Sequence, residues 1–360
     1  MSDHKPVHLI GPYPPPYGGV AVHVEGLLGC IPPDERRMRL MGYGDWAKPP
    51  DGGKRLGARV SPAAIGRLAA SAPSGALLHD HSTLPVTPSP QSAAAFEAAH
   101  RLKRWRWIAT IHDGTWPERF AKYEGWRRKL VLRLAERAER FIFVSEELRD
   151  FAESELGLKG GSVIPPLLPL PRNAAAKELP AGIERIFSSH DRVWIACGAM
   201  IPNYDFPTIA SAILEEKQDG ANVALILFDG GFESDAATTG TVARTLSCLG
   251  ESAVVLKSAP RAVVLGAMLR SGLCIRGVRE ESFGLSRIEA LWAGCRLVAT
   301  PTGLRIGAVE YAFGDAQSLR AAMKKAIKTP IDFFSKAAEE MTRQAARNME
   351  SIKALYAELD

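Results

Sequence analysis

Short apolar runs alternate with longer segments of helical period along the whole chain. The apolar runs predict strands, which in the first half of the chain are Val7–Gly11, Gly75–His79, Trp107–Ile111 and Phe141–Ser145. In the second half they are Val193–Gly198, Asn222–Asp229, Ala253–Lys257, Leu273–Arg276 and Arg296–Thr300. Strands that alternate with helices favour parallel, doubly wound sheets. The pattern therefore predicts an α/β protein.

A proline-rich stretch separates the two halves of this pattern. Residues 164–172 hold four prolines in nine positions, and neither a helix nor a central strand accepts that many. At 360 residues the chain is long enough for two α/β domains of ordinary size. We expect one doubly wound domain over residues 1–170 and a second over residues 171–336.

The overall composition is that of a globular protein. Apolar residues make up 46% and charged residues 24% of the chain. No apolar run reaches the roughly 18 residues that a membrane span needs, and the first residues lack the apolar core of a signal peptide. We therefore expect a cytoplasmic protein. The five cysteines are scattered without a Cys-x-x-Cys pair, which predicts reduced core residues and not a zinc or redox site.

The positive charge is concentrated in the first half of the chain. Residues 1–175 hold 24 Lys and Arg against 18 Asp and Glu, whereas residues 176–360 hold 21 against 22. Residues 101–140 alone carry 12 basic and 5 acidic side chains. The aromatic residues interleaved with them are Trp105, Trp107, Trp116, Phe120, Tyr123 and Trp126. This pattern is typical of an anionic membrane surface contact, or of a solvated helix face over core aromatics. We expect no nucleic-acid partner, because no recognised nucleic-acid motif accompanies the charge.

The stretch from Glu281 to Thr300 carries the most specific chemistry. Glu281 and Glu289 lie eight positions apart, separated by a Gly-Leu-Ser turn, and a helical run then leads into the strand predicted at 296–300. A helix that begins near Gly284 presents backbone N–H groups and a positive dipole end, which favour phosphate. Carboxylates beside it accept hydrogen bonds from hydroxyl groups. Two glutamates at this spacing alone would more often be solvated acids of a loop and a helix.

Two further groups follow predicted strands. A glycine pair, Gly18 and Gly19, comes after the first strand, where backbone can approach a ligand closely. Histidines His79, His81 and His112 lie at the ends of two other strands, where ligands of parallel sheets gather. A lone histidine there is more often structural. A zinc site of these three histidines has no close helical ligand pair to support it.

The stretch from Glu281 through Glu289-Ala-Leu-Trp-Ala-Gly294 resembles the Glu-x7-Glu signature of retaining GT-B glycosyltransferases of family 4. The resemblance implies two Rossmann-like domains that face a cleft. Residues 1–170 would bind the acceptor and residues 171–336 the nucleotide sugar, while the final helix, about 337–360, packs back on the first domain.

The resemblance also implies roles for particular residues. His112 and Glu281 would be the catalytic residues, with Glu281 holding sugar hydroxyls and Glu289 the nucleotide ribose. The donor-binding residues would be Gly18, Gly19, Gly198, Arg276, Ser282, Phe283, Gly284, Leu285, Ser286 and Glu289. In such enzymes the leaving phosphate takes the acceptor's proton, so the protein supplies positioning and electrostatics. Since the chain has no Asp-x-Asp motif, we expect no metal requirement and no cofactor.

The chain departs from the family's pattern at two places. Where the family has an Arg and a Lys that neutralise the leaving diphosphate, this sequence has Ala199 and Tyr204, and such charge-assisted bonds are strong. Arg276, Arg279 or Arg287 could substitute from the other side of the site. Residues 302–310 replace the family's Gly-Gly-x-Pro-Glu turn.

The sequence thus predicts a retaining, metal-independent hexosyltransferase in bacterial polysaccharide or cell-surface glycan synthesis. It would move a sugar from a nucleotide-diphosphate sugar to a glycan or lipid-linked acceptor, in the cytoplasm or peripherally at the inner membrane face. The alternative is a non-catalytic GT-B-like protein that binds sugar or a partner glycosyltransferase. We also expect Glu281, as an acid on a loop, to contribute little to stability.

Overall fold

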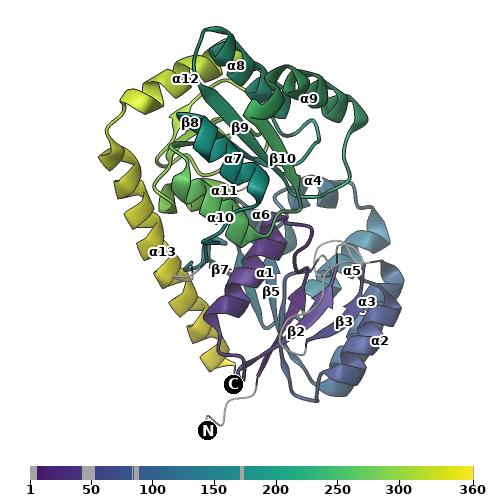
Figure 1. Ribbon diagram of the computed structural model, residues 1–360. Helices are drawn as coiled ribbons and strands as arrows, with labels where there is room; N and C mark the ends of the chain where they lie inside the picture. Colours follow the sequence, from purple (N-terminus) through teal and green to yellow (C-terminus); the bar gives the residue numbers. More distant parts are fainter. Residues whose placement is uncertain are drawn as a thin grey trace. The chain divides into compact units, whose positions relative to one another are not determined.

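The structure is a computed structural model that describes residues 6–42, 53–82, 84, 89–170, 174–281 and 283–359. One predicted donor-binding residue, Ser282, lies outside the described residues, as do Pro171 and Arg172 of the proline-rich stretch. The chain divides into two compact units (Figure 1). Unit 1 comprises Met1–Pro169 and Ala345–Asp360, and unit 2 comprises Leu170–Gln344. The sequence placed the boundary at 170/171 and the start of the returning segment at about 337.

The described part of unit 1 contains one seven-stranded parallel sheet. In spatial order its strands are β3 (Lys54–Gly57), β2 (Arg36–Met41), β1 (Val7–Gly11), β4 (Leu77–Asp80), β5 (Arg106–Ile111), β6 (Arg140–Phe143) and β7 (Ser162–Val163). Its helices are α1 (Gly19–Cys30), α2 (Pro62–Ser71), α3 (Pro90–Lys103), α4 (Trp116–Ala121), α5 (Gly125–Ala135) and α6 (Glu146–Leu156). The order 3-2-1-4-5-6 is that of the Rossmann fold.

Apolar clusters cover both faces of this sheet, as expected of parallel strands. One face carries helices α2 to α6 around Phe96, Trp107 and Trp116. The other face carries α1 and the last turns of α13 (Ile331–Glu358), where Leu27 and Ile352 belong to one cluster. Asn348 fixes this end of α13, because its amide donates to two carbonyl oxygens of the proline-rich stretch, at 2.9 Å each.

Strands β2 and β3 were missed in the sequence. β2 reads Arg-Arg-Met-Arg-Leu-Met, and its three arginines hide the apolar run. Arg39 is nevertheless buried, because its guanidinium donates to the carbonyl oxygens of Met38 and Ser71, at 3.1 Å each. Short β7 and β13 (Val309–Glu310) were also missed, since two-residue strands leave no periodicity.

The arginines of β2 make one neighbouring histidine sensitive to acid. His8 is buried on β1 and pairs in register with Arg37. Burial, together with the charges of Arg39 and Arg37, lowers the pKa of His8 to about 4. The folded protein therefore keeps His8 neutral at a pH where the unfolded chain, with a histidine pKa of about 6.5, has already bound a proton. The free energy of folding that neutral His8 contributes is fully present above the pKa of the unfolded chain. It is lost as the pH falls toward the pKa of the folded protein.

We therefore expect His8→Gln to reduce acid sensitivity. Between pH 7.5 and pH 4.5 the unfolding free energy of the variant, relative to the natural protein, is expected to rise by about 2 kcal/mol. Urea denaturation at both pH values measures this difference. All other titrating groups are the same in the two proteins, so their contributions to the unfolding free energy cancel. A difference that does not change with pH would show that His8 ionises normally in the folded protein.

Unit 2 repeats the architecture with a six-stranded parallel sheet among its described residues. In spatial order its strands are β10 (Ala253–Lys257), β9 (Val223–Asp229), β8 (Arg192–Gly198), β11 (Leu273–Arg276), β12 (Arg296–Ala299) and β13. Its helices are α7 (Ala181–Ser189), α8 (Phe206–Gln218), α9 (Ala236–Leu249), the short 3-10 helix η1 (Gly250–Ser252), α10 (Arg261–Arg270), α11 (Leu285–Trp292), α12 (Ala316–Lys328) and the first part of α13. One apolar cluster joins the central strands, built of residues such as Ile195, Leu225 and Val298, to helices on both faces.

Every strand that the sequence predicted is present, with ends that differ by at most two residues. The predicted α/β class with two Rossmann-like sheets is therefore confirmed. Figure 1 shows both sheets with their flanking helices. None of the helices in the described ranges has both the length and the apolar character needed to cross a membrane.

Candidate functional site

Both sheets have a topological switch point, where the strand order reverses. In unit 1 it lies between β1 and β4, and in unit 2 between β8 and β11. Open α/β sheets bind ligands outside the carboxyl ends of the strands at such points. Most residues predicted from the sequence lie at or after the ends of these strands, while His112 follows the neighbouring β5. The two units are described separately.

A buried ionic cluster follows β11 in unit 2. Arg276, at the end of β11, donates through Nε to Glu281 Oε1 at 3.1 Å and makes a second bond to that carboxylate through Nη2. Arg287 of α11 donates from Nε to Glu281 Oε2 at 3.1 Å. The side chain of Glu281 is 9% exposed and that of Arg287 is 1% exposed. Two guanidinium groups thus enclose one carboxylate, and the cluster carries one net positive charge.

All three groups of this cluster are ionised near pH 7, although burial lowers the pKa of Arg287 and the charge of Glu281 only partly offsets it. Burial would raise the pKa of Glu281, but the charges and hydrogen bonds of Arg276 and Arg287 outweigh it and hold that pKa below its usual range. Burial likewise opposes the charge of Arg276, yet Glu281 raises its pKa. These surroundings argue against the expectation that Glu281 has little part in stability, because its carboxylate is the counter-ion of two buried cations.

The loop after β8 packs against this cluster. Ala199, where the family has Arg, is buried, and the ring of Tyr204, where the family has Lys, lies under the Arg276 guanidinium at 5.0 Å. A Cβ on Gly198 would lie 2.5 Å from the Tyr204 ring, so this position requires glycine. Asn203 joins the loop to the one after β11 through bonds of 3.0 and 3.1 Å to the backbone of Glu280.

Of the arginines that the sequence offered as substitutes, two lie in the cluster and one does not. Arg276 and Arg287 both bind Glu281, whereas the guanidinium of Arg279 lies over the Phe313 ring at 5.0 Å. The altered turn at 302–310 supplies acceptors for Arg287. Its Nη1 donates to the Leu304 carbonyl at 3.0 Å and its Nη2 to the Thr302 hydroxyl at 3.3 Å.

Helix α11 begins directly beside the cluster. Its N-cap is Gly284, with φ of +87°, which has no side chain to cap the first N–H groups of the helix, those of Leu285 and Ser286. Phe283 precedes it and accepts a backbone bond from Leu304 at 3.1 Å. The hydroxyl of Ser286 is buried and has no hydrogen-bond partner among the described residues. This arrangement favours binding of an anion, because the free N–H donors, the positive end of the helix dipole and the net positive charge of the cluster all attract negative charge.

Glu289 lies one turn further into α11 and is also paired. Its Oε1 accepts a bond of 2.6 Å from Nε of Arg261, the first residue of α10, and its side chain is 10% exposed. No sequence pattern indicated this partner, because 28 residues separate Arg261 from Glu289. The predicted contact of Glu289 with a ribose stays a prediction.

In unit 1, the glycine pair opens helix α1. Gly18 is the N-cap in extended conformation, with φ of −104°. Gly19 is exposed, and a Cβ placed on it would meet nothing within 4 Å. Neither backbone conformation demands glycine, so the open space above Gly19 is the feature that suits close approach of a ligand.

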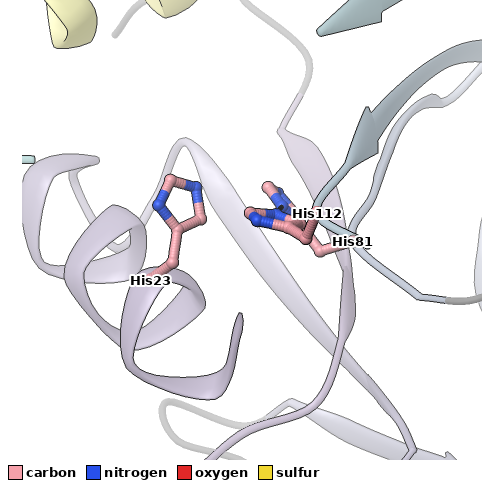
Figure 2. A group of neighbouring side chains, drawn as sticks. All are labelled: His23, His81 and His112. Atoms are coloured by element: carbon pink, nitrogen blue, oxygen red, sulfur yellow. Dashed lines mark hydrogen bonds between the residues drawn. The ribbon is translucent and has the colours of Figure 1, made fainter. Parts of the chain in front are cut away.

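Three histidines gather at the switch point of unit 1 (Figure 2). They are His23 on α1, His81 after β4 and His112 after β5, and one ligand atom from each lies within 4.8 Å of the others. His81 Nδ1 is 3.1 Å from His112 Nε2. Burial, with smaller effects from neighbouring imidazoles, lowers the pKa of His81 and of His112 well below the usual range. Both rings are therefore neutral near pH 7.

In the sequence, His79 groups with His81 and His112, whereas the structure places His23 beside those two residues. His79 is fully buried and bound on both sides, with Nδ1 2.6 Å from the Tyr356 hydroxyl and Nε2 2.7 Å from the Thr110 hydroxyl. The three histidines considered together in the sequence, His79, His81 and His112, are therefore not the three that gather here. His23 was missed because it lies inside a helix. Its position four residues after Gly19 would turn it toward the strand ends and was the available signal.

The basic segment 101–140 turns most of its aromatics inward. Trp105, Trp107, Trp116 and Phe120 belong to the core of unit 1. Trp126 is 57% exposed on α5, where the Arg127 guanidinium lies 5.4 Å from its ring. The interpretation of a solvated helix face over core aromatics holds for these four, and Trp126 is the large aromatic that the described surface of this segment presents.

Several solved structures share this fold over nearly their whole length. Sucrose-phosphate synthase from Thermosynechococcus elongatus has a TM-score of 0.68 at 15% identity, with 99% of each chain covered. The chain has the GT-B fold. HepE of Anabaena, in complex with UDP and glucose, has a TM-score of 0.67 at 14% identity, covering 98% of this chain and 100% of HepE. The trehalose-6-phosphate synthase OtsA has a TM-score of 0.66 at 14% identity, with 98% and 99% covered.

The GT-B fold is thus the one that the Glu281–Gly294 stretch predicted. No protein-family model matches the sequence, and no curated protein is similar to it. At identities of this size the likeness establishes the architecture, and function has to be argued from the site.

Proposed function

We propose that this chain is a glycosyltransferase that uses a nucleotide-diphosphate sugar, with retention of configuration and without a metal requirement. The observation that carries the proposal is the start of α11. There, uncapped N–H groups, the Ser286 hydroxyl and a cluster of net positive charge meet at the switch point of unit 2. A diphosphate is the ligand that matches these donors and this charge. The similar HepE structures, solved with UDP and with UDP-glucose, support the same ligand class.

The residues of unit 2 suit charge stabilisation more than nucleophilic attack. Transfer breaks the bond between the anomeric carbon and the phosphate oxygen and forms a bond to the acceptor oxygen on the same face. The leaving diphosphate takes the acceptor's proton. Arg276 and Arg287 would stabilise the negative charge that develops on the diphosphate, in the place of the cations absent at 199 and 204. Glu289 and the amides of residues 283–286 would position the donor.

Unit 1 would contribute His112 and the Gly18–Gly19 start of α1. We propose that His112 contacts the sugar near its reacting carbon and that the exposed backbone at Gly19 lies against the donor phosphate. The acceptor would be a glycan or a lipid-linked sugar of a bacterial cell-surface polysaccharide.

A second candidate is a non-catalytic GT-B protein. It is favoured by the same cluster, because Arg276 and Arg287 already satisfy both oxygens of Glu281, whose predicted role is to hold sugar hydroxyls. A protein that binds a nucleotide sugar without transferring it would need no more than the start of α11.

The two candidates differ in turnover when water replaces the acceptor. We expect slow release of free sugar from the donor, and proton NMR recorded before mutarotation should show the donor's own anomeric configuration. An inverted product would contradict retention. Donor binding without any release of nucleoside diphosphate would favour the non-catalytic protein.

His112→Ala is expected to slow this release by about 10²-fold while donor affinity changes by no more than a few-fold. The reason is that a residue beside the reacting carbon acts mainly in the transition state. Calorimetry gives the affinity and nucleoside-diphosphate release gives the rate. His100→Ala, in a helix of the same unit, is the control. Unchanged turnover in His112→Ala would show that His112 has a structural role and does not act in the reaction.

We further propose that α4 and α5 contact an anionic membrane surface, at the inner face of the membrane. Trp126 with Arg127, Arg128 and Lys129 forms an exposed basic and aromatic stretch of α5, and each cation near anionic lipid contributes about 1 kcal/mol. Trp126→Ala should therefore reduce co-sedimentation with phosphatidylserine vesicles. Sedimentation that is independent of anionic lipid would contradict the proposal.

A further inference from the structure

We propose that His23, His81 and His112 form a binding site for one divalent transition-metal ion, with zinc as the preferred ion. The site lies wholly within unit 1, and the three ligands come from three separate elements, α1, the residue after β4 and the residue after β5. Figure 2 shows the three rings converging. The proposal concerns metal binding alone and rests on these three residues, but it shares His112 with the proposed transferase function.

One distance in the cluster matches tetrahedral coordination, and the third ligand atom lies near enough for ring rotation to bring it closer. Zinc binds imidazole nitrogen at about 2.0–2.1 Å, so two ligand nitrogens of a tetrahedral ion lie about 3.3 Å apart. His81 Nδ1 and His112 Nε2 are 3.1 Å apart. The third ligand atom, from His23, lies within 4.8 Å of the other two. An ion would take the position of the proton that His81 and His112 now share, and that proton would move to the other nitrogen of the ring that donates it.

A backbone carbonyl orients the His23 ring for this role. His23 Nδ1 is 3.1 Å from the carbonyl oxygen of Pro166. A carbonyl oxygen only accepts, so Nδ1 carries the proton and the lone pair of the neutral ring is on Nε2. Metal-binding histidines usually donate their second N–H to a carbonyl or carboxylate in this way, which fixes the tautomer.

The cluster contains a buried polar atom that the protein does not satisfy. His81 is 3% exposed, and its Nε2 has no hydrogen-bond partner among the described residues. The adjacent His79 ring, with its centroid 4.1 Å from that of His81, is held by Tyr356 and Thr110. An unsatisfied buried nitrogen costs about 1–3 kcal/mol, and the protein bears this cost in a ring whose other nitrogen, Nδ1, faces His112.

The donor set also selects the ion. Three neutral imidazoles suit zinc, cobalt, nickel and copper, whereas magnesium and calcium require oxygen ligands. Three protein ligands leave one position of a tetrahedral ion open for water or a ligand oxygen. Since the ion would take the His112 lone pair, it would compete with any direct role of His112 toward a sugar.

The test is calorimetric titration of the EDTA-stripped full chain with zinc chloride. We expect one ion per chain, and no heat with magnesium chloride. His23→Ala and His81→Ala should each weaken binding by at least about 10²-fold, while His190→Ala in unit 2 leaves it unchanged. A stoichiometry of zero, or equal affinity in His23→Ala and the natural protein, would overturn the proposal.

A second measurement needs no variant and so does not depend on how the variants fold. X-ray absorption of the natural protein loaded with one equivalent of zinc should show about three imidazole nitrogens at about 2.0–2.1 Å. Coordination by sulfur, or by fewer than two imidazoles, would overturn the assignment of these histidines.

Discussion

Glu281→Ala is expected to lower the free energy of unfolding by about 3–5 kcal/mol, because it leaves two buried guanidinium groups without their counter-ion. Arg276 and Arg287 have side-chain exposures of 11% and 1%, so water cannot replace the carboxylate. Urea denaturation followed by circular dichroism measures the change. The same variant should lose transfer, which means that its loss of activity alone cannot assign Glu281 a catalytic role.

The controls for Glu281 separate its charge from its size. Glu281→Gln keeps the shape of the side chain and still accepts hydrogen bonds, so we expect a smaller loss of stability. Glu310→Ala breaks the Arg305–Glu310 pair, whose side chains are 61% and 38% exposed, and should change the stability very little. A cost for Glu281→Ala as small as that of Glu310→Ala would contradict the buried cluster.

Gly284→Ala is expected to be the most damaging glycine substitution near the start of α11. The backbone there has φ of +87°, and a Cβ would lie 2.5 Å from Glu281 Oε2 and 3.1 Å from Arg287 Cδ. Backbone strain of about 1–3 kcal/mol is therefore combined with displacement of the ionic cluster. We expect a loss of about 3 kcal/mol or more in unfolding free energy and loss of nucleotide affinity, measured by denaturation and calorimetry.

Gly294→Ala is the matched control. Gly294 follows α11 with φ of +78°, but a Cβ there would meet nothing within 4 Å. This variant should show the backbone strain alone, with nucleotide affinity retained. Equal losses in the two variants would mean that contact with Glu281 has no part in the effect at Gly284.

The fold could be predicted because parallel strands buried on both faces are continuous apolar runs. Val223–Asp229 is buried along its whole length and appears in the sequence as one such run. β2 could not be predicted in this way. Its arginines are accommodated by backbone carbonyl groups, among them that of Ser71, which is remote in sequence.

The candidate site could be predicted only in part, because several of its residues have partners that are remote in sequence. The glycine at the start of α11 and the flanking acids were visible as a local string. The partners of those acids were not, since Arg261 lies 28 residues before Glu289. Likewise, His23 lies beside His81 and His112 although it is remote from them in sequence, and its position four residues after Gly19 was the only local signal.

We propose above all that the start of α11 binds the diphosphate of a nucleotide sugar. The most direct measurement is a thermal-shift and calorimetric screen of UDP, GDP, TDP and CMP with their sugar conjugates, with and without EDTA, on the natural protein and on Ser286→Ala. A ligand that binds the folded state at 100 times its Kd stabilises it by about 2.7 kcal/mol. We predict that one nucleoside diphosphate and its sugar raise the midpoint, independently of EDTA, and that Ser286→Ala weakens binding about 5- to 10-fold at unchanged stability. Absence of binding by every nucleotide, or full affinity in Ser286→Ala, would contradict the account.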